Sequence, residues 1–197
     1  LLNENDKDNL PEIVRKSASS IYNQGKKLAA LVDNLIDFVS IENLKNSDLK
    51  ISESNIEELF MEIIGEYQNK DSNIIFKTAI LDKFSLNVDR ELIKKALKQL
   101  IDNGIKFNRS EQKLIILSAQ IKDNKKMISV GDNGIGIPGE EISKIFNKFY
   151  QIEASFTGQV EGWGLGLALV KKIVSLHNGK VFVKSQIDRG SAFTIVL

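Results

Sequence analysis

The sequence predicts an α+β fold, a two-layer α/β sandwich that follows one long helix. Two observations lead to this prediction. From Asp8 to about Asn46 no glycine-rich turn interrupts the chain, and apolar residues recur at helical spacing. After Asn46, helical segments and antiparallel hairpins alternate without the strict strand–helix–strand rhythm of a doubly wound sheet.

The first segment, Asp8 to about Asn46, is expected to form a single helix. Pro11 suits its first turn, where a missing N–H costs nothing. The apolar positions follow the four–three alternation of a helix that packs along one seam. They are Ile21, Gly25, Leu28, Val32, Leu35 and Val39, with Leu31 and Phe38 widening the stripe. Because a single helix would leave this seam in water, it needs a partner, either in its own domain or in a bundle between chains.

The next part of the chain is expected to contain three strands and two helices. Asn55 or Ser54 caps the first helix and Asp89 caps the second, because their side-chain oxygens can accept from free N–H groups. A turn around Asp82 joins two of the strands. The elements are strand Leu49–Ser52, helix Asn55–Tyr67, strands Ile74–Ala79 and Phe84–Val88, and a helix from Asp89 to about Lys106.

The last part begins with a hairpin that turns at Asp123-Asn124. Its final helix should end at Asn178-Gly179, since both residue types tolerate a left-handed conformation. The elements are strands Lys113–Lys122 and Lys126–Gly131, a helix after Pro138, a loop from about Gln151 to Gly162, helix Leu165–His177, and strands Val181–Ser185 and Ala192–Leu197.

Composition excludes several classes of protein. Of the 197 residues, 42% are hydrophobic and 27% charged, as in ordinary soluble domains. The net charge of +1 gives no bulk attraction to nucleic acid or to a membrane surface. The absence of cysteine excludes disulfides and thiolate metal sites. Because the chain starts at Leu1 and shows no signal peptide, we interpret it as a piece of a longer protein.

Three polar residues form a stripe on the helix that follows Asp89. Gln99, Asn103 and Lys106 are spaced by four and three residues, so they share one face. Amide oxygens suit a hard cation such as Mg²⁺, and a lysine supplies a mobile positive charge for phosphate. Taken alone, such a stripe is more often a solvated helix face than a ligand site.

Two glycine-rich segments are candidates for ligand contact. Asp132-Asn133-Gly134-Ile135-Gly136-Ile137-Pro138 follows a strand, and its carboxylate could accept from an amino group such as that of adenine. Gly162-Trp163-Gly164-Leu165-Gly166-Leu167 opens a helix, where bare N–H groups can bind phosphate. The first could also be a plain strand-to-helix turn, and the second a helix start with spare glycines.

Together and in this order, the clusters resemble the N, G1 and G2 boxes of the histidine kinase catalytic domain. The F box of that family is similar to Ile145-Phe146-Asn147-Lys148-Phe149-Tyr150-Gln151. Residues 164–179 are close to the usual sequence of the family in this region. The resemblance covers residues 49–197 and implies the Bergerat ATP-binding fold. Asp33-Asn34-Leu35-Ile36-Asp37-Phe38, with Ile41-Glu42, resembles the end of the second dimerisation helix. Residues 1–48 would then be the last part of the dimerisation and phosphoacceptor domain.

The resemblance implies ATP and Mg²⁺ as ligands and assigns a role to each matching residue. Gln99, Asn103 and Lys106 would be catalytic, with Asn103 binding Mg²⁺ and Lys106 contacting phosphate. Asp132 would accept from adenine. A mobile lid from about Gln151 to Glu161, which contains no basic residue, would cover the pocket. The remaining nucleotide-binding residues would be Phe107, Gly134, Gly136, Ile137, Phe149, Gly162, Gly164, Leu165, Gly166, Leu167 and Ser191.

The resemblance also implies phosphoryl transfer from ATP to a histidine on the dimerisation domain, for relay to a response regulator. We expect a homodimer, a cytoplasmic location, and no contact with nucleic acid or membrane. His177 is the only histidine of the chain, and we expect it to cap helix carbonyls and complement the helix dipole, not to accept phosphate. Two alternatives remain: an ATP-driven clamp of the gyrase, mismatch-repair and Hsp90 type, and a nucleotide-binding regulatory module without kinase activity.

Overall fold

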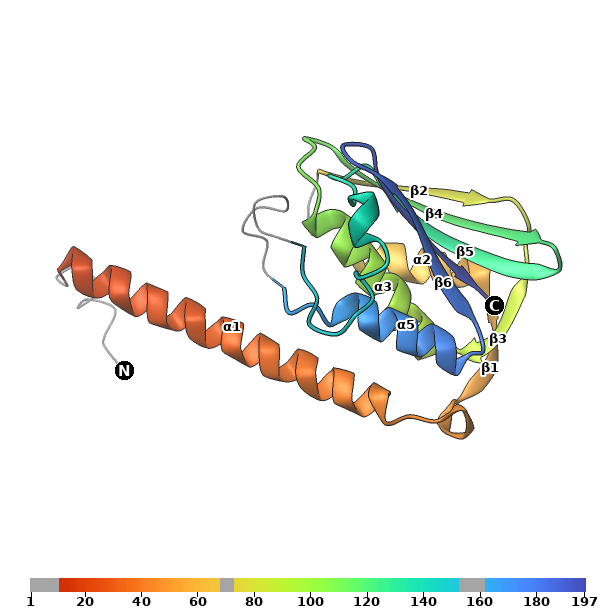
Figure 1. The fold of residues 1–197 in the computed structure, drawn as a ribbon, viewed down its shortest axis with the longest axis horizontal. Helices are drawn as coiled ribbons and strands as arrows, with labels where there is room; N and C mark the ends of the chain where they lie inside the picture. Colours follow the sequence, from red (N-terminus) through yellow and green to blue (C-terminus); the bar gives the residue numbers. More distant parts are fainter. Residues whose placement is uncertain (1–10, 68–72, 153–161) are drawn as a thin grey trace. The chain divides into compact units, whose positions relative to one another are not determined.

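The computed structural model describes residues 11–67, 73–152 and 162–197 (Figure 1). The chain separates into two compact units, Leu1–Val39 and Ser40–Leu197. The boundary expected between residues 48 and 49 stays a prediction. Much of the expected lid, residues 153–161, lies outside the described part, as does the expected start of the long helix at Asp8.

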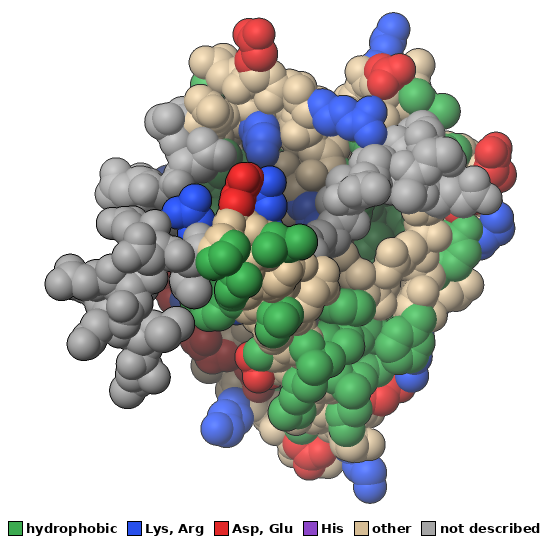
Figure 2. All heavy atoms as spheres, turned by 90° about the vertical axis from the view of Figure 1, so that its left-hand side faces the viewer, with side chains coloured by type: hydrophobic (Ala, Val, Ile, Leu, Met, Phe, Trp, Pro, Cys, Tyr) green, Lys and Arg blue, Asp and Glu red, His purple; other side chains and the backbone are tan. Residues whose placement is uncertain are grey.

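The long helix α1 (Glu12–Glu42) confirms the helix predicted for this segment. Much of its apolar seam is exposed, with Ile21 at 73% and Leu28 at 61%, whereas Phe38 near the end of the helix is 6% exposed. Hydrophobic side chains gather in the lower half of the view in Figure 2. No helix in the described ranges is long and apolar enough to cross a membrane.

The second unit is built on a five-stranded mixed sheet with the order β2-β4-β5-β7-β6. The strands are β2 (Ile74–Ile80), β4 (Lys113–Lys122), β5 (Lys125–Asp132), β6 (Lys180–Gln186) and β7 (Gly190–Val196). β2 and β4 are parallel, whereas the other neighbours are antiparallel. Asp123 and Asn124 have φ values of 51° and 57°, which confirms the predicted hairpin turn.

A separate two-stranded sheet joins β1 (Ile51–Asn55) to β3 (Ser85–Asp89). The strand predicted at Leu49–Ser52 was placed too early, because β1 runs on until Asn55 pairs with Ser85. β2 and β3 follow one another but do not pair. Instead, Asp82 between them accepts a hydrogen bond from Ile121 N–H of β4 at 2.8 Å.

Three helices cover one face of the large sheet, which confirms the two-layer sandwich (Figure 1). They are α2 (Ile56–Tyr67), α3 (Arg90–Lys106) and α5 (Gly166–Leu176). Asn55 caps α2, since its Oδ1 accepts from Glu57 N–H at 2.8 Å. The core between the layers includes Phe60, Leu97 and Ile115, all at most 1% exposed. α5 ends as predicted, with Asn178 at φ 57°.

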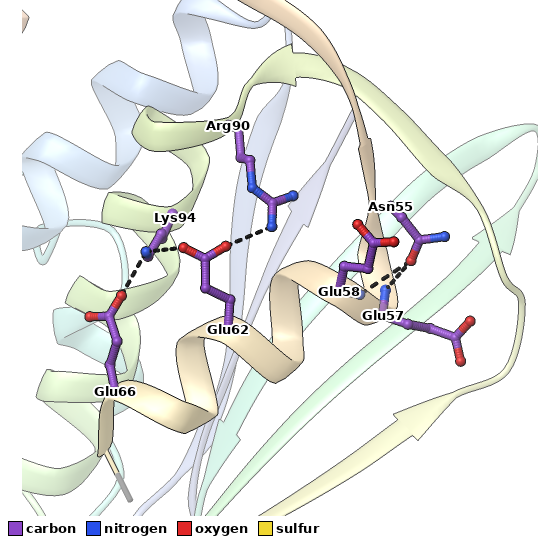
Figure 3. Close-up of polar contacts among 7 residues, drawn as sticks. All are labelled: Asn55, Glu57, Glu58, Glu62, Glu66, Arg90 and Lys94. Carbon is purple, nitrogen blue, oxygen red and sulfur yellow. Dashed lines mark hydrogen bonds and ion pairs between the residues drawn. The ribbon is translucent and has the colours of Figure 1, made fainter.

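A ladder of ion pairs joins α2 to α3 on the outer side of the helical layer (Figure 3). Glu62 accepts from Arg90 at 2.6 Å, and Lys94 bonds both Glu62 and Glu66, the latter at 2.6 Å. Hydrogen bonds from Lys94 and from Lys98 lower the pKa of Glu66 to about 2. The same contacts with Lys94 and Arg90 lower the pKa of Glu62.

The prediction of a helix after Pro138 is wrong. Only a short 3₁₀ turn, η3 (Gly139–Glu141), forms there, and turns continue to Phe149. Most of the backbone bonds in this segment join residues three apart, as from Asn147 N–H to the Lys144 carbonyl at 2.8 Å, and one, from Ile145 N–H to the Glu141 carbonyl, joins residues four apart. Phe149 then takes φ 61° and donates its N–H to the Gly164 carbonyl at 2.8 Å, so the chain reverses where a helix would have continued. A second 3₁₀ turn, η2 (Asn46–Asp48), lies between α1 and β1.

Candidate functional site

The polar stripe predicted on α3 lies apart from the buried face of that helix. Asp89 starts α3 by accepting from Leu92 N–H at 3.2 Å. Ile93 and Leu97 are fully buried against the other layer. Gln99 and Asn103 are partly buried and Lys106 is exposed. The three polar side chains therefore lie outside the fully buried face of α3.

The glycine segment at the start of α5 lies directly against this stripe. A Cβ built on Gly166 would come within 2.4 Å of Gln99 Nε2, and one on Gly162 would come within 2.7 Å of Lys106 Nζ. Gly164 has φ 66°, which a side chain would disfavour. The structure thus brings the first and third predicted clusters together, with the Gln99 side chain packed against the first residue of α5.

Asp132, at the end of β5, is held by two backbone N–H groups. Its Oδ1 accepts from Gly134 at 2.8 Å and from Ser191 at 3.3 Å. Burial raises the pKa of Asp132, and the hydrogen bonds from Gly134 and Ser191 oppose this effect. Gly104 of α3 lets the carboxylate lie close to that helix, because a Cβ there would come within 3.0 Å of Asp132 Cβ.

Two of the glycines after Asp132 allow other backbone segments of the chain to pass close to them. A Cβ on Gly134 would meet the Phe107 carbonyl oxygen at 2.6 Å. Gly136 has φ 72°, and its Cβ would lie 2.1 Å from the Gln186 carbonyl oxygen. Ile137 is fixed next to them by a bond from its N–H to Ser185 Oγ at 2.8 Å. Their predicted contact with adenine and ribose stays a prediction, but the backbone alone already requires glycine at both positions.

The apolar residues predicted for the site differ in exposure. Phe107 ends α3, and Lys106 Nζ lies 5.4 Å from the centre of its ring. Phe149 is 64% exposed, whereas Leu165 is 5% exposed and packs in the core. Leu167 is partly buried. Phe107 and Phe149, the aromatic residues of this set, are thus at least partly exposed.

Asn133, which was not among the predicted site residues, fixes the segment after α3 to the end of β5. Asn133 Oδ1 accepts from Asn108 Nδ2 and from Leu114 N–H, both at 2.7 Å. Its Nδ2 donates to the Gln112 carbonyl at 3.1 Å. The only signal in the sequence is its place beside Asp132. These bonds hold the chain around Phe107 in register with Asp132.

His177 contacts a helix carbonyl as predicted, but it does not supply positive charge. Its Nδ1 lies 2.8 Å from the Ile173 carbonyl oxygen, and its Nε2 accepts from Asp89 N–H at 2.9 Å. A ring nitrogen that accepts carries no proton, so the ring is neutral and Nδ1 is the donor. The expected complement to the helix dipole is therefore wrong.

Residues 88–197 match the family of histidine kinase-, DNA gyrase B- and HSP90-like ATPases. The chain belongs to this family. The matched range contains the polar stripe of α3, Asp132 and the glycine segment before α5.

Among relatives of this ATPase family, the sensor protein RprX of Bacteroides fragilis is 30% identical over 191 residues. The alignment covers 95% of this chain and 37% of RprX, so the chain spans well under half of that relative. The catalytic domain of histidine kinase ThkA is 27% identical with a TM-score of 0.65, over 76% of this chain and 95% of that one. The predicted resemblance to histidine kinase catalytic domains is confirmed.

Two further structures of the ATPase family share the fold. ThkA in complex with the response regulator protein TrrA has a TM-score of 0.71 at 24% identity, over 95% of this chain and 52% of that one. Full-length ShkA in complex with AMPPNP has a TM-score of 0.74 at 23% identity, over 95% of this chain and 39% of that one.

Proposed function

We propose that the chain binds ATP with Mg²⁺ and transfers its γ-phosphoryl group to a histidine on the dimerisation domain of a sensor histidine kinase. The observation that carries this proposal is the meeting of Lys106 with the glycine segment at the start of α5, on the same side of α3 as Gln99. A lysine beside the N–H groups of a glycine-rich helix start forms a site suited to phosphate.

Asp132 suits the base of an adenine nucleotide. Its carboxylate is largely buried and bonded by Gly134 and Ser191, which together leave lone pairs for one more donor. The adenine amino group is such a donor. Guanine presents a carbonyl oxygen at the same place, which a carboxylate repels. The geometry therefore supports selectivity for ATP over GTP.

Asn103 suits Mg²⁺ as one ligand among several. The described residues contain no cluster of three or more aspartate, glutamate or histidine side chains that could bind a metal without help. Mg²⁺ prefers six oxygen ligands and often keeps water and phosphate oxygens among them. An amide oxygen from Asn103 would add one protein ligand to a nucleotide-bound ion and so hold the phosphates near Lys106.

The partners follow from the kind of relative that the chain matches. RprX is a sensor protein, and ThkA is a histidine kinase whose structure is known with a response regulator protein. We propose a response regulator as the final phosphate acceptor and a homodimer through α1, whose apolar seam is exposed. The protein that contains this chain would then be a two-component sensor kinase.

Titration calorimetry tests the nucleotide site. We expect the chain to bind Mg·ATP and Mg·ADP, with weaker binding of ATP when Mg²⁺ is removed and of GTP in all conditions. Lys171→Ala, an exposed change on α5, should leave both affinities unaltered. No heat with either adenine nucleotide at millimolar concentration would contradict the proposal.

Phosphotransfer is tested with a second protein that holds the dimerisation hairpin of a related kinase. We expect radiolabel from ATP on that hairpin and none on the chain itself, because both ring nitrogens of His177 are already bonded. The label should be acid-labile and base-stable. Label on this chain that is lost in His177→Ala would show that the acceptor is misplaced.

A further inference from the structure

Helices α3 and α5 are joined by three contacts that run in opposite order along the two helices. Lys106, at the end of α3, lies against Gly162 before α5. Gln99, in the middle of α3, lies against Gly166 at the start of α5. At the other end, Asp89 at the start of α3 bonds His177 at the end of α5. The helices are therefore antiparallel neighbours, fixed at both ends of their contact.

The contact at the far end depends on the histidine ring. Its Nε2 accepts from the N–H of Asp89, the residue whose carboxylate caps α3. Its Nδ1 donates to the carbonyl of Ile173, one turn back in α5. One rigid ring thus connects the last turn of α5 to the first turn of α3, and neither nitrogen is left for chemistry.

The segment between α1 and β1 is attached at the same junction. Asp89 Oδ2 accepts from Lys50 N–H at 2.9 Å. Asn46 Nδ2 donates to Asn178 Oδ1, next to the ring, at 3.2 Å. A movement of residues 46–50 would therefore act on both helices at once.

We propose that His177 is a positioning residue that sets how far α3 and α5 can slide along each other, an inference that rests on the nucleotide site proposed above. A slide would change the distance between Lys106 and the N–H groups near Gly166, which together hold phosphate. The two bonds of the Asp132 carboxylate come from Gly134 and from Ser191 of β7, so a slide of α5 along α3 would leave them in place. Loss of the His177 hydrogen bonds should weaken binding of the phosphates and leave binding of the adenine base unchanged.

Two variants separate the two bonds of the ring. In His177→Asn the side-chain amide can reach the Ile173 carbonyl in place of Nδ1, but it is too short to reach Asp89. In His177→Gln the amide oxygen can take the place of Nε2 and accept from Asp89. Both variants are polar and close in volume to histidine, and thermal unfolding is measured to check that each is folded at the temperature of the binding measurement.

The readout is the ratio of the dissociation constants for adenosine and for Mg·ATP, measured by calorimetry. We expect His177→Asn to reduce this ratio about tenfold or more, with the adenosine constant changed less than about threefold. His177→Gln should keep the ratio of the unaltered chain. An equal loss for both ligands in His177→Asn, or an unchanged ratio, would overturn the positioning role. Failure of the unaltered chain to bind Mg·ATP would instead refute the proposed function.

Discussion

Gln99 and Gly166 are packed so closely that no side-chain carbon fits between them. A Cβ on Gly166 would lie 2.4 Å from Gln99 Nε2 and 2.6 Å from Gln99 Cδ. Atoms this close cannot coexist without movement, so the glycine sets the position of the amide relative to the first residue of α5. This contact joins the predicted catalytic stripe of α3 to the predicted phosphate side of the site.

We expect Gly166→Ala to displace Gln99 and to weaken Mg·ATP binding by about tenfold, since displacements of the order of 1 Å are costly at such sites. Adding Gln99→Ala should remove the clash and recover part of the loss, with a coupling energy of about 0.5–3 kcal/mol in the double-mutant cycle. Calorimetry on the four proteins gives this value. Gly139→Ala is the control, because its Cβ would have no atom within 4 Å. Strictly additive effects would show that the two residues act separately.

Gly136→Ala should destabilise the fold by about 2 kcal/mol or more, because it combines a left-handed φ with a collision against backbone. The colliding atom is the Gln186 carbonyl oxygen, 2.1 Å from the added carbon. Urea denaturation of the variant beside Gly139→Ala measures the difference. Equal unfolding midpoints for the two variants would mean that the loop relaxes freely, contrary to expectation.

Asp132→Asn should weaken ATP and ADP binding by about 1.5–3 kcal/mol, because it removes a charge-assisted hydrogen bond. This corresponds to roughly 10- to 150-fold in dissociation constant. The fold should be nearly unaffected, since an amide oxygen can still accept from Gly134 and no buried charge remains. Binding by calorimetry and unfolding by urea are measured together. A variant that loses stability and affinity in proportion would point to a structural role for Asp132.

The ion pairs of Lys94 should make stability depend on pH in the acid range. The folded pKa of Glu66 is lowered from 4.5 to about 2, and that of Glu62 is lowered as well. A lowered folded pKa contributes stability that is full above pH 4.5 and is lost as the pH falls towards 2. Lys94→Met should therefore cost more stability at pH 7 than at pH 3, measured by urea unfolding. The control Lys171→Met should change stability only slightly, and by the same amount at pH 7 and at pH 3. A cost for Lys94→Met that does not change with pH would contradict the role of the ladder.

Local signals in the sequence predicted most elements of the fold. The caps Asn55 and Asp89 and the left-handed residues Asn124 and Asn178 mark element ends through bonds or angles within a few residues. The pairing of β2 with β4, and not with β3, was not predictable from such signals. It depends on bonds between segments far apart in the chain, such as Asp82 to Ile121.

The candidate site shows the same difference between local signals, which the sequence reveals, and contacts between distant segments, which it does not. Gln99, Asn103 and Lys106 share a stripe because of helical spacing, which the sequence shows directly. Their closeness to the glycine segment required the resemblance to a known domain, since no local rule brings α3 to α5. The roles of Asn133 and of His177 were missed or half understood, because each depends on hydrogen bonds to residues 19 to 88 positions away.

The position of β7 has a consequence for the order in which the protein can be made. β7 is the last strand of the chain but lies inside the large sheet, between β5 and β6. Until Gly190–Val196 has left the ribosome, β6 has no strand to pair with and Asp132 lacks its bond from Ser191 N–H. A nascent chain that stops short of β7 would expose two unpaired strand edges, which favour aggregation. We therefore expect the proposed nucleotide site to stay incomplete until β7 has been made.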